Sequence, residues 1–371
     1  MNVLSLKKRI LLADEKYALI AIAAGFFILN QALELLIMKF SGFRYTDMCT
    51  WDCGWYRGIV EGGYDLEPHA HERMDAANWA FFPVFPLFAR FVYTVFDVSH
   101  SYALLISSRF FFLLSIIYFM KLSKVYFPAI PLTVAASVVA LNPFAIYGNV
   151  GYTESCFLFF TSAFFYNLKQ ERFVLAGVVG GILSAVRLAG NFALIAYLYV
   201  AIRKLIEDWR HAERRFRPEP LVLGGMLIPL GLSLYMFFLY RHTGDAFAFS
   251  HIQRAWDRSP GNPFARIGDG LSGDAYGKYL ALMSAAALIV PAFLLYKRHV
   301  ELAIFSVLCT LIPLSTGLWS MPRYIFWQAP VLLTVACACT NRKIWILFLI
   351  GSVIMQLAIY TAWFTGRGWV I

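Results

Sequence analysis

The sequence predicts an all-α protein that crosses a membrane many times. Apolar residues make up 60% of the 371 positions and charged residues only 15%, whereas globular domains carry about 45–50% and about 25%. The mean hydropathy of +0.63 leaves too little charged surface for a soluble fold of this size. The aromatic content of 17% excludes a disordered chain. The apolar stretches are continuous rather than alternating, which argues against a membrane β-barrel.

Eleven stretches are apolar enough to be membrane-spanning helices, each near the roughly 20 residues that a bilayer requires. We expect them at 17–38, 102–120, 128–147, 153–168, 173–189, 191–206, 221–240, 279–296, 300–318, 323–340 and 343–364. A twelfth apolar stretch, 79–96, contains Pro83, Pro86 and Arg90. Because proline removes a backbone donor and breaks helices, we expect this stretch to lie half-immersed at the membrane surface.

The basic residues orient these spans. The net charge is +10, which in a soluble protein would suggest nucleic acid but in a membrane protein reflects Lys and Arg in cytoplasmic loops. If 79–96 does not span, the basic N-terminus and the basic run 203–217 are both cytoplasmic; if it spans, nearly all basic loops move outside. We therefore expect eleven spans in the plasma (inner) membrane, an outer C-terminus, and no nucleic-acid partner.

Two polar loops, 40–78 and 241–278, both lie on the outer side in this topology. Loops longer than about 15 residues without structure of their own are often functional. The sequence shows no soluble domain and no internal repeat. We therefore expect one integral membrane domain over 1–371, with 40–78 as the first outer, catalytic loop, 79–96 as its half-immersed segment and 241–278 as the second outer loop.

The cysteines and histidines do not predict a metal site, because no cluster of them has zinc-ligand spacing. Cys49 and Cys53 stand four apart in the first loop, and this spacing leaves both a disulfide and two free thiols open. The remaining cysteines lie in apolar stretches and are expected to be small buried residues: Cys156, Cys309, Cys337 and Cys339.

Asp47 and Asp52 stand out among the seven carboxylates of the first loop, because they lie among Trp51, Trp55 and Tyr56 just after the first span. One interpretation is an aromatic belt at the membrane interface. The other is a sugar-binding platform, on which aromatic faces stack against the apolar faces of a sugar. A carboxylate at the edge of such a platform would serve as a general base.

Further ionisable residues lie in or beside apolar spans. Glu154 and Arg187 form either a structural pair between neighbouring spans or part of a functional cavity. Arg323, at the outer end of a span, either extends toward the interface or binds a phosphate with its planar fork. The second loop adds a compact polar and aromatic cluster, HIQRAW, with His251, Gln253, Arg254 and Trp256.

Several of these segments resemble the GPI mannosyltransferase II family. WDCGWYRGIVEGGY followed by AFFPVFPLF resembles the first-loop signature of that family, in which a WD pair precedes an amphipathic helix, a GY and an FFPxxP segment. LNPFAIYGNVGYTES resembles its NP…GYSE stretch, AVRLAGN its VRSNG stretch, and HIQRAW its IQ…W element. These segments follow the family's order from about residue 45 to residue 257, over half of the chain.

The resemblance implies a multi-pass glycosyltransferase of the GT-C class, with juxtamembrane helices in the first outer loop. Such enzymes take a sugar from a polyprenyl-phosphate donor on the outer membrane face and invert its anomeric carbon. The family uses dolichyl-phosphate mannose and a GPI acceptor. Nothing in this chain points to GPI, so we expect mannose, or another hexose, to pass to a hydroxyl of a glycolipid, glycan or protein on the periplasmic or extracellular side.

The resemblance also suggests roles. The catalytic aspartate of the family matches Asp52, our candidate for the general base, with Asp47 second. Arg187 or Arg323 would neutralise the departing lipid phosphate, so no metal cofactor is expected. The other expected substrate-binding residues are Trp51, Trp55, Tyr56, Tyr152, Glu154, His251, Gln253 and Trp256.

Two other classes of protein remain as alternatives. A transporter or flippase of a lipid-linked sugar would also need intramembrane charges, but transporters often carry inverted repeats, which this sequence does not show. A scaffold subunit of a membrane complex would leave Asp52, Glu154 and Arg187 without a role. Sugar transfer by the purified protein distinguishes the classes.

Overall fold

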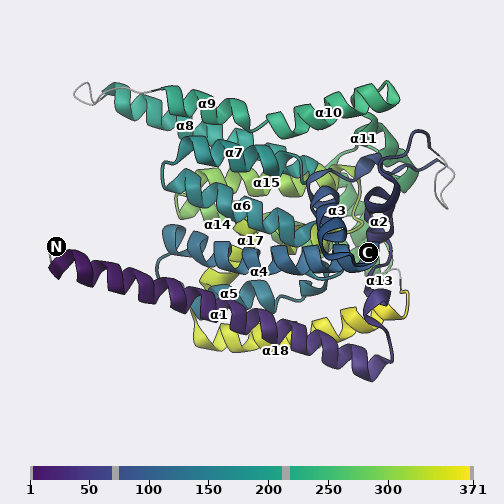
Figure 1. Cartoon of the computed structure of the whole chain (residues 1–371), viewed down its shortest axis with the longest axis horizontal. Helices are drawn as coiled ribbons and strands as arrows, with labels where there is room; N and C mark the ends of the chain where they lie inside the picture. The colour runs from purple at the N-terminus through teal and green to yellow at the C-terminus, as the bar shows by residue number, and fades with distance from the viewer. Residues whose placement is uncertain (1–2, 69–74, 211–217, 368–371) are drawn as a thin grey trace.

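The computed structural model describes residues 3–68, 75–210 and 218–367. These residues fold into 18 α-helices and five short 3₁₀ helices, and no strand occurs among them. The expected all-α architecture is therefore confirmed. Figure 1 shows that the long helices run roughly along one direction, with α1 and α18 side by side at one edge and α8, α9 and α10 at the opposite edge.

The helices follow one another with short connections. The first half of the chain contains α1 (Val3–Ser41), α2 (Asp52–Gly62), α3 (Val84–Phe96), α4 (His100–Tyr126), α5 (Leu132–Ala140), α6 (Glu154–Lys169), α7 (Phe173–Ser184) and α8 (Ala193–Arg210). The second half contains α9 (Glu219–Leu227), α10 (Leu230–Thr243), α11 (Ala248–His251), α12 (Pro263–Ser272), α13 (Ala275–Ala287), α14 (Ile289–Tyr296), α15 (Val300–Thr316), α16 (Met321–Phe326), α17 (Ala329–Ala338) and α18 (Arg342–Phe364).

Six segments of the described chain are long and apolar enough to cross a membrane. They are Tyr17–Phe40, His100–Tyr126, Leu188–Arg210, Glu219–Thr243, Ala275–Tyr296 and Arg342–Phe364. The protein is therefore a multi-pass membrane protein. The expected count of eleven is not established, because the helices in the other five stretches are shorter than a full span. Prolines help to explain the short pieces: Pro229 separates α9 from α10, and Pro330 opens α17.

The segment 79–96 forms a short helix rather than a full span, and its half-immersed position stays a prediction. A 3₁₀ turn, η2 (Asn78–Ala80), precedes α3, which has 13 residues and is too short to span a bilayer. One side of α3 is buried against the bundle through Phe85 and Ala89, and Phe91 on another side is exposed. In Figure 1, α3 lies across the direction of the long helices rather than along it.

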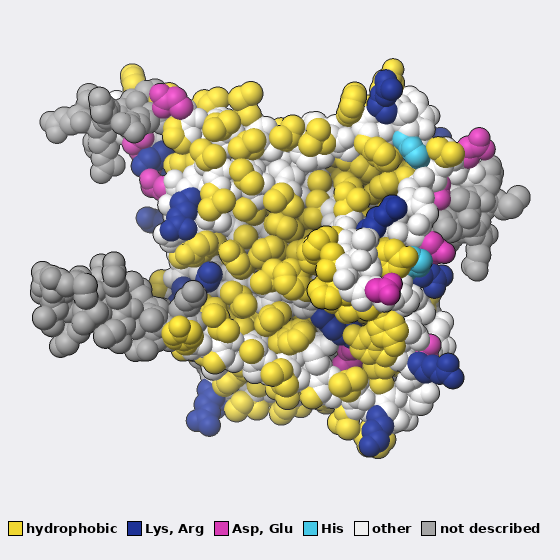
Figure 2. All heavy atoms as spheres, viewed as in Figure 1, with side chains coloured by type: hydrophobic (Ala, Val, Ile, Leu, Met, Phe, Trp, Pro, Cys, Tyr) yellow, Lys and Arg dark blue, Asp and Glu magenta, His cyan; other side chains and the backbone are white. Residues whose placement is uncertain are grey.

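The two polar loops come together at one end of the bundle. Figure 1 places α2 and α3 of the first loop region and α11 of the second loop at the end opposite the N-terminus. The last residues of α8 and the first residues of α9 lie at the other end. Figure 2 shows the face of the bundle that is turned to the viewer in Figure 1. Apolar side chains cover the middle of that face and charged side chains lie toward its two ends, as a membrane-embedded bundle requires. The identity of the outer side stays a prediction.

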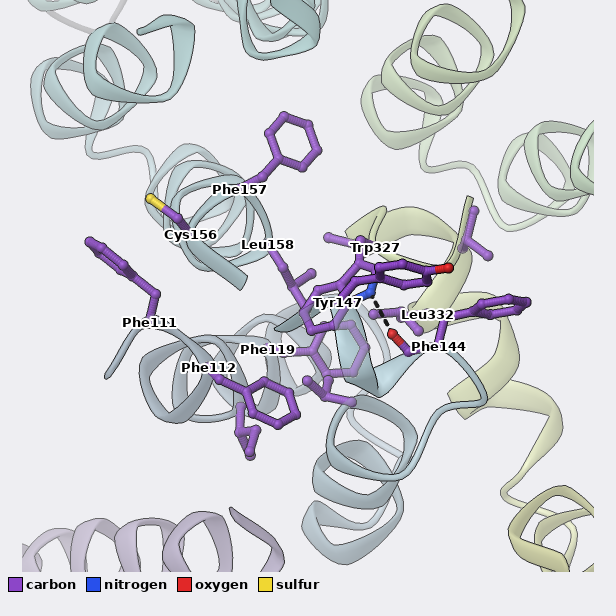
Figure 3. Packing of buried hydrophobic residues seen from close by; sticks show 14 of the residues in the cluster. Phe111, Phe112, Phe119, Phe144, Tyr147, Cys156, Phe157, Leu158, Trp327 and Leu332 are labelled. Atoms are coloured by element: carbon purple, nitrogen blue, oxygen red, sulfur yellow. Dashed lines mark hydrogen bonds between the residues drawn. The ribbon is translucent and has the colours of Figure 1, made fainter. Parts of the chain in front are cut away.

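A dense aromatic core fixes the segment that leads into α6. Trp327 is fully buried, and its Nε1 donates to the carbonyl of Phe144 at 3.0 Å (Figure 3). The indole edge lies against Gly148, where an added Cβ would meet a ring carbon of Trp327 at 2.4 Å. Only glycine fits there, so η3 (Ala145–Gly148) packs closely against Trp327, the C-cap residue of α16.

A buried polar network joins α1, α4 and α18 to the same segment. Arg109 of α4 forms an ion pair with Glu34 of α1 and donates to the carbonyl of Asn149 at 2.7 Å. Its Nε donates to Gln31 at 2.7 Å, and the hydroxyl of Tyr360 in α18 donates to Glu34 Oε2 at 3.0 Å. Buried charges are stable only when paired and hydrogen-bonded, and this pair meets both conditions.

Candidate active site

Asp52 is the first residue of α2 and lies in a constrained turn. The preceding residue, Trp51, has a φ of 48°, which few non-glycine residues adopt. A disulfide joins Cys49 to Cys53, with 5.1 Å between their Cα atoms. Of the two alternatives that the spacing left open, the structure contains the disulfide. The turn is therefore closed on both sides of Asp52, which limits the motion of its carboxylate.

The segment before α6 packs directly onto this turn. Gly151 has a φ of +78°, and an added Cβ there would meet the sulfur of Cys53 at 2.6 Å, so both conformation and space require glycine. The next residue, Tyr152, accepts a hydrogen bond from the backbone N–H of Asp52 at 3.1 Å and donates to the carbonyl of Thr50 at 3.3 Å. The start of α6 is thus fixed to the start of α2.

Four charged residues from distant parts of the chain meet beside this junction. Arg323 of α16 lies 2.8 Å from Asp52 through Nη1, and its Nε lies 3.1 Å from Glu154 Oε1. Arg187, just before η4 (Leu188–Phe192), pairs with the same Glu154 oxygen at 2.6 Å. The structure therefore brings together the expected residues Asp52, Glu154, Arg187 and Arg323.

We refer to Asp52, Glu154, Arg187 and Arg323 as the charged cluster. Its two carboxylates differ in how much of each side chain is exposed to solvent. The side chain of Glu154 is fully buried, whereas that of Asp52 is 24% exposed. Among the described residues, Oε2 of Glu154 has no hydrogen-bond partner, although buried polar atoms nearly always have one. Asp52 is thus the accessible carboxylate, and Glu154 is an acceptor with unused capacity.

An aromatic group adjoins the cluster. The ring of Trp55 stacks on Phe81 with 5.8 Å between centroids and meets Trp256 edge-on at 5.3 Å. Trp51 packs edge-on against Trp363 of α18 at 4.5 Å. Trp55 belongs to α2 and Trp256 ends η5 (Ile252–Trp256). The first and second loops therefore meet through these rings, as a sugar platform would require.

Tyr56 lies one residue beyond Trp55 and faces the interior. Its hydroxyl is 3.4 Å from the Thr153 hydroxyl, in the residue before Glu154. Burial raises the pKa of the Tyr56 hydroxyl, so the phenol stays protonated. Tyr56 therefore supports the junction between α2 and α6.

Two expected site residues do not join the cluster. Asp47 is exposed, and its Oδ2 accepts a hydrogen bond from the backbone N–H of Arg44 at 2.8 Å, which caps its own turn, η1 (Tyr45–Met48). His251 is exposed, and its Nδ1 lies 2.6 Å from Asp245. Gln253 follows in η5 and is half-buried.

The His251–Asp245 pair lies in the second loop, outside the candidate spans. Burial acts to raise the pKa of Asp245, but the hydrogen bonds from His251 and the Phe247 N–H outweigh it and lower that pKa. The Phe247 N–H donates to Asp245 at 2.8 Å. Asp245 therefore orients the imidazole of His251 and leaves its other ring nitrogen toward the exposed side.

Sequence reasoning missed two residues that adjoin the cluster. Tyr324 follows Arg323, and its hydroxyl accepts hydrogen bonds from Arg258 Nη2 at 3.0 Å and from Arg323 Nη2 at 3.3 Å. Arg258 stands two residues after Trp256, just beyond the HIQRAW segment. The sequence did offer one indication of both residues, because Tyr324 directly follows Arg323 and Arg258 lies two positions after Trp256.

The described part of the chain holds no group of three or more His, Cys, Asp or Glu side chains that could bind a metal ion. What the cluster offers instead is a carboxylate, held by a guanidinium, at the edge of an aromatic surface. A carboxylate in such a position is able to accept a proton from a hydroxyl, and guanidinium groups are able to stabilise a developing negative charge.

Solved structures of an archaeal oligosaccharyltransferase, from Archaeoglobus fulgidus, resemble this chain. Its apo form aligns with a TM-score of 0.51 at 12% identity, over 96% of this chain and 56% of that protein. The same protein with an inhibitory peptide and a dolichol-phosphate aligns with a TM-score of 0.48 at 13% identity, over 94% of this chain and 56% of that one. This chain therefore spans about half the length of the oligosaccharyltransferase.

No family model matches the sequence, and no curated protein matches it. The resemblance to the GPI mannosyltransferase II family thus stays a prediction. At this level of identity the likeness to the oligosaccharyltransferase concerns the fold alone. The chain has an all-α membrane fold of the GT-C type.

Proposed function

We propose that this protein is an inverting GT-C glycosyltransferase. It moves a hexose, mannose if the family resemblance holds, from a polyprenyl-phosphate donor to an acceptor hydroxyl at the outer face of the membrane. The observation that carries the proposal is the position of Asp52, which is 24% exposed and 2.8 Å from Arg323. It lies next to the aromatic rings at one end of a GT-C-type bundle.

The chemistry is a single displacement. The acceptor hydroxyl gives its proton to Asp52 as its oxygen bonds to the anomeric carbon of the sugar. The bond from that carbon to the phosphate oxygen breaks, and the lipid phosphate leaves with the electron pair. One displacement at one carbon inverts its configuration, as in glycosidic chemistry with a single attack.

The guanidinium groups of the charged cluster supply the electrostatic part of this reaction. Negative charge builds up on the leaving phosphate oxygen, and fixed cations near that oxygen stabilise the transition state more than the ground state. Arg187 is 20% exposed, and its one ion pair within the described residues is with Glu154. Arg323 is 5% exposed and lies against both carboxylates. Arg187 is thus the more available of the two.

Sugar recognition is assigned to the rings and to Glu154. Trp55 and Trp256 meet at 5.3 Å between centroids, which forms an apolar surface suited to the flat faces of a hexose. Oε2 of Glu154 has no partner among the described residues but is fully buried, so it would accept from a sugar hydroxyl only where the bound sugar displaces the groups that cover it. The remaining expected contacts, Tyr152, Trp51 and Tyr56, hold the turn that carries Asp52.

Two features support an outer location for the site. The disulfide between Cys49 and Cys53 adjoins Asp52, and structural disulfides persist mainly in oxidising compartments. The basic residues of 203–217 also favour a cytoplasmic location for the opposite end of the bundle. Both point to the periplasmic or extracellular side of a plasma membrane, with a glycolipid, glycan or protein as acceptor.

The proposal is tested with protein purified in detergent. Short-chain polyprenyl-phosphate mannose, glucose and arabinose are each supplied with lipid extract of the host, and both free polyprenyl phosphate and the glycosylated product are measured. We expect one donor to yield both products in equal amounts. A protein that forms no glycosidic bond but moves labelled donor across a vesicle membrane would be the alternative, a flippase.

A further inference from the structure

The charges around the site do not balance within the described residues. Asp52 and Glu154 supply two negative charges, and Arg187 and Arg323 compensate them through ion pairs of 2.6–3.1 Å. Arg258 supplies a third guanidinium, which donates to the Tyr324 hydroxyl as Arg323 does. No carboxylate of the described chain pairs with Arg258. The site therefore carries one positive charge more than its carboxylates neutralise.

The three guanidinium groups converge on one side chain. Their central carbons lie 5.5, 5.6 and 5.1 Å from the ring centroid of Tyr324, for Arg187, Arg258 and Arg323 in that order. Three guanidinium groups gathered around one ring raise the positive potential at this position, because like charges repel one another. Tyr324 offers one ring and one hydroxyl, and the hydroxyl already accepts from two of the three. An anion would relieve the remaining repulsion.

Arg258 is the guanidinium best placed to bind that anion. Arg323 is 5% exposed and held by two carboxylates, and Arg187 is held by Glu154. Arg258 is half-buried, and the single hydrogen bond that its guanidinium makes within the described residues goes to Tyr324 at 3.0 Å. Its other N–H groups are therefore available. A planar guanidinium fork matches two oxygens of a phosphate.

The position of Arg258 also connects phosphate binding to sugar binding. It stands two residues after Trp256, which meets Trp55 at 5.3 Å. A short stretch of the second loop thus presents an aromatic face and a free guanidinium toward the same site. A sugar phosphate has the complementary arrangement, with a ring beside an anionic group.

We infer that Arg258, supported by Tyr324, is the group that binds a phosphate directly in this site, while Arg187 and Arg323, each paired with a carboxylate, stabilise that phosphate through their nearby positive charge. Assigning this phosphate to the lipid-linked sugar donor rests on the proposed function. The existence of a phosphate site is independent of the proposed function, because it follows from the excess positive charge of the three guanidinium groups over the two carboxylates. The chemistry recognised is a phosphate group, free or attached to a lipid.

The inference is tested by binding rather than by turnover. Decyl phosphate and inorganic phosphate are titrated separately into the purified full-length protein in a neutral detergent, by calorimetry. Wild type is expected to bind decyl phosphate, and Arg258→Gln to bind it about 10–100-fold more weakly, the range for loss of a charged hydrogen bond. Arg258→Lys restores part of the affinity, and Tyr324→Phe loses less than Arg258→Gln.

Arg254→Gln is the matched control, because Arg254 lies in the same loop, is exposed and makes no side-chain hydrogen bond or ion pair among the described residues. Tighter binding of decyl phosphate than of inorganic phosphate would assign the site to a lipid phosphate, and equal binding to free phosphate. The inference is overturned if wild type binds neither probe, if Arg258→Gln binds as wild type does, or if Arg254→Gln weakens binding equally.

The same variants separate this inference from the proposed function. Binding that depends on Arg258, in a protein that transfers no sugar from any donor, would support the phosphate site and contradict the glycosyltransferase. Transfer that proceeds normally in Arg258→Gln, with unchanged donor KM, would support the glycosyltransferase and contradict the phosphate site. Monodisperse elution of each variant shows that the protein is folded.

Discussion

Two ion clusters lie inside this bundle, and they differ in how completely their atoms are satisfied. In the cluster around Glu34, both carboxylate oxygens have partners. Oε1 pairs with Arg109, and Oε2 accepts a hydrogen bond from the Tyr360 hydroxyl at 3.0 Å. In the second, Oε2 of Glu154 has no partner among the described residues, and Asp52 is partly exposed.

The clusters share a structural element. Asn149 receives a hydrogen bond from Arg109 at 2.7 Å, and five residues later Glu154 pairs with Arg187. The saturated cluster therefore anchors the segment that carries the unsaturated one. Fully connected buried polar networks stabilise a single arrangement, whereas unused polar atoms are costly unless a ligand occupies them. The difference suggests that the Glu34 cluster serves stability and the Glu154 cluster serves chemistry.

The largest expected effect is on turnover when Asp52 loses its charge. Asp52→Asn is nearly isosteric and removes proton acceptance, so the transfer rate at saturating donor should fall about 10²–10⁴-fold, or roughly 3–5.5 kcal/mol in activation free energy. Asp47→Asn should change the rate much less, because Asp47 caps its own exposed turn. If Asp47→Asn is inactive and Asp52→Asn is not, the two roles are reversed.

The next effect is on stability. Glu34→Ala leaves Arg109 buried without its anion, which typically costs about 3–5 kcal/mol of unfolding free energy. Glu207→Ala is the matched control, since Glu207 pairs with Arg203 at 3.2 Å with side chains 53% and 56% exposed. Such exposed pairs contribute about 0–1 kcal/mol. Thermal unfolding in detergent measures both, and equal unfolding temperatures for the two variants would refute the distinction.

The arginines of the charged cluster should differ from each other. Arg323→Lys loses three interactions, with Asp52, Glu154 and Tyr324, whereas Arg187→Lys loses the fork toward Glu154 alone. We expect about 10–100-fold weaker donor use, as kcat/KM, for Arg323→Lys and a smaller loss for Arg187→Lys. Arg203→Lys, at an exposed position, should match wild type. Identical losses at 323 and 187 would mean that the extra contacts of Arg323 are not used.

The smallest effect concerns the disulfide. Closing the short turn around Asp52 limits where its carboxylate lies, so reduction should lower turnover a few-fold without unfolding the protein. A variant with both Cys49→Ser and Cys53→Ser should have this lower rate already and be insensitive to dithiothreitol. Cys337→Ser, a free and partly buried thiol, should respond to the reductant as wild type does. A rate that reductant leaves unchanged in wild type would exclude a positioning role for the bond.

The sequence was sufficient for the fold class because apolar content and span length act locally. It also singled out 79–96 as a segment that does not span, but it did not predict the helix α3 there, which accommodates Pro86 in its first turn. It was not sufficient for the number of spans. Tertiary packing holds helices such as α5, with 9 residues, that are too short to be recognised as spans by length.

The site was predictable residue by residue but not as an arrangement. Asp52, Glu154 and Arg187 were selected as charged residues among apolar ones, yet Asp52 and Arg323 are 271 positions apart and no local pattern joins them. Glu34 and Arg109 are also charged residues within apolar spans, so the same reasoning would have selected them, but the sequence analysis did not include them. Only the hydrogen bonds of the folded chain separate these two uses of buried charge.

The most direct test compares Asp52→Asn and Glu34→Ala in one series, with turnover counted per monodisperse molecule. If one cluster performs chemistry and the other provides stability, Asp52→Asn keeps the unfolding temperature of wild type and loses at least about 100-fold in turnover. Glu34→Ala then unfolds at a lower temperature, while its folded fraction retains most of the wild-type turnover. Near-normal turnover in folded Asp52→Asn protein would contradict the assignment of the chemistry to this cluster.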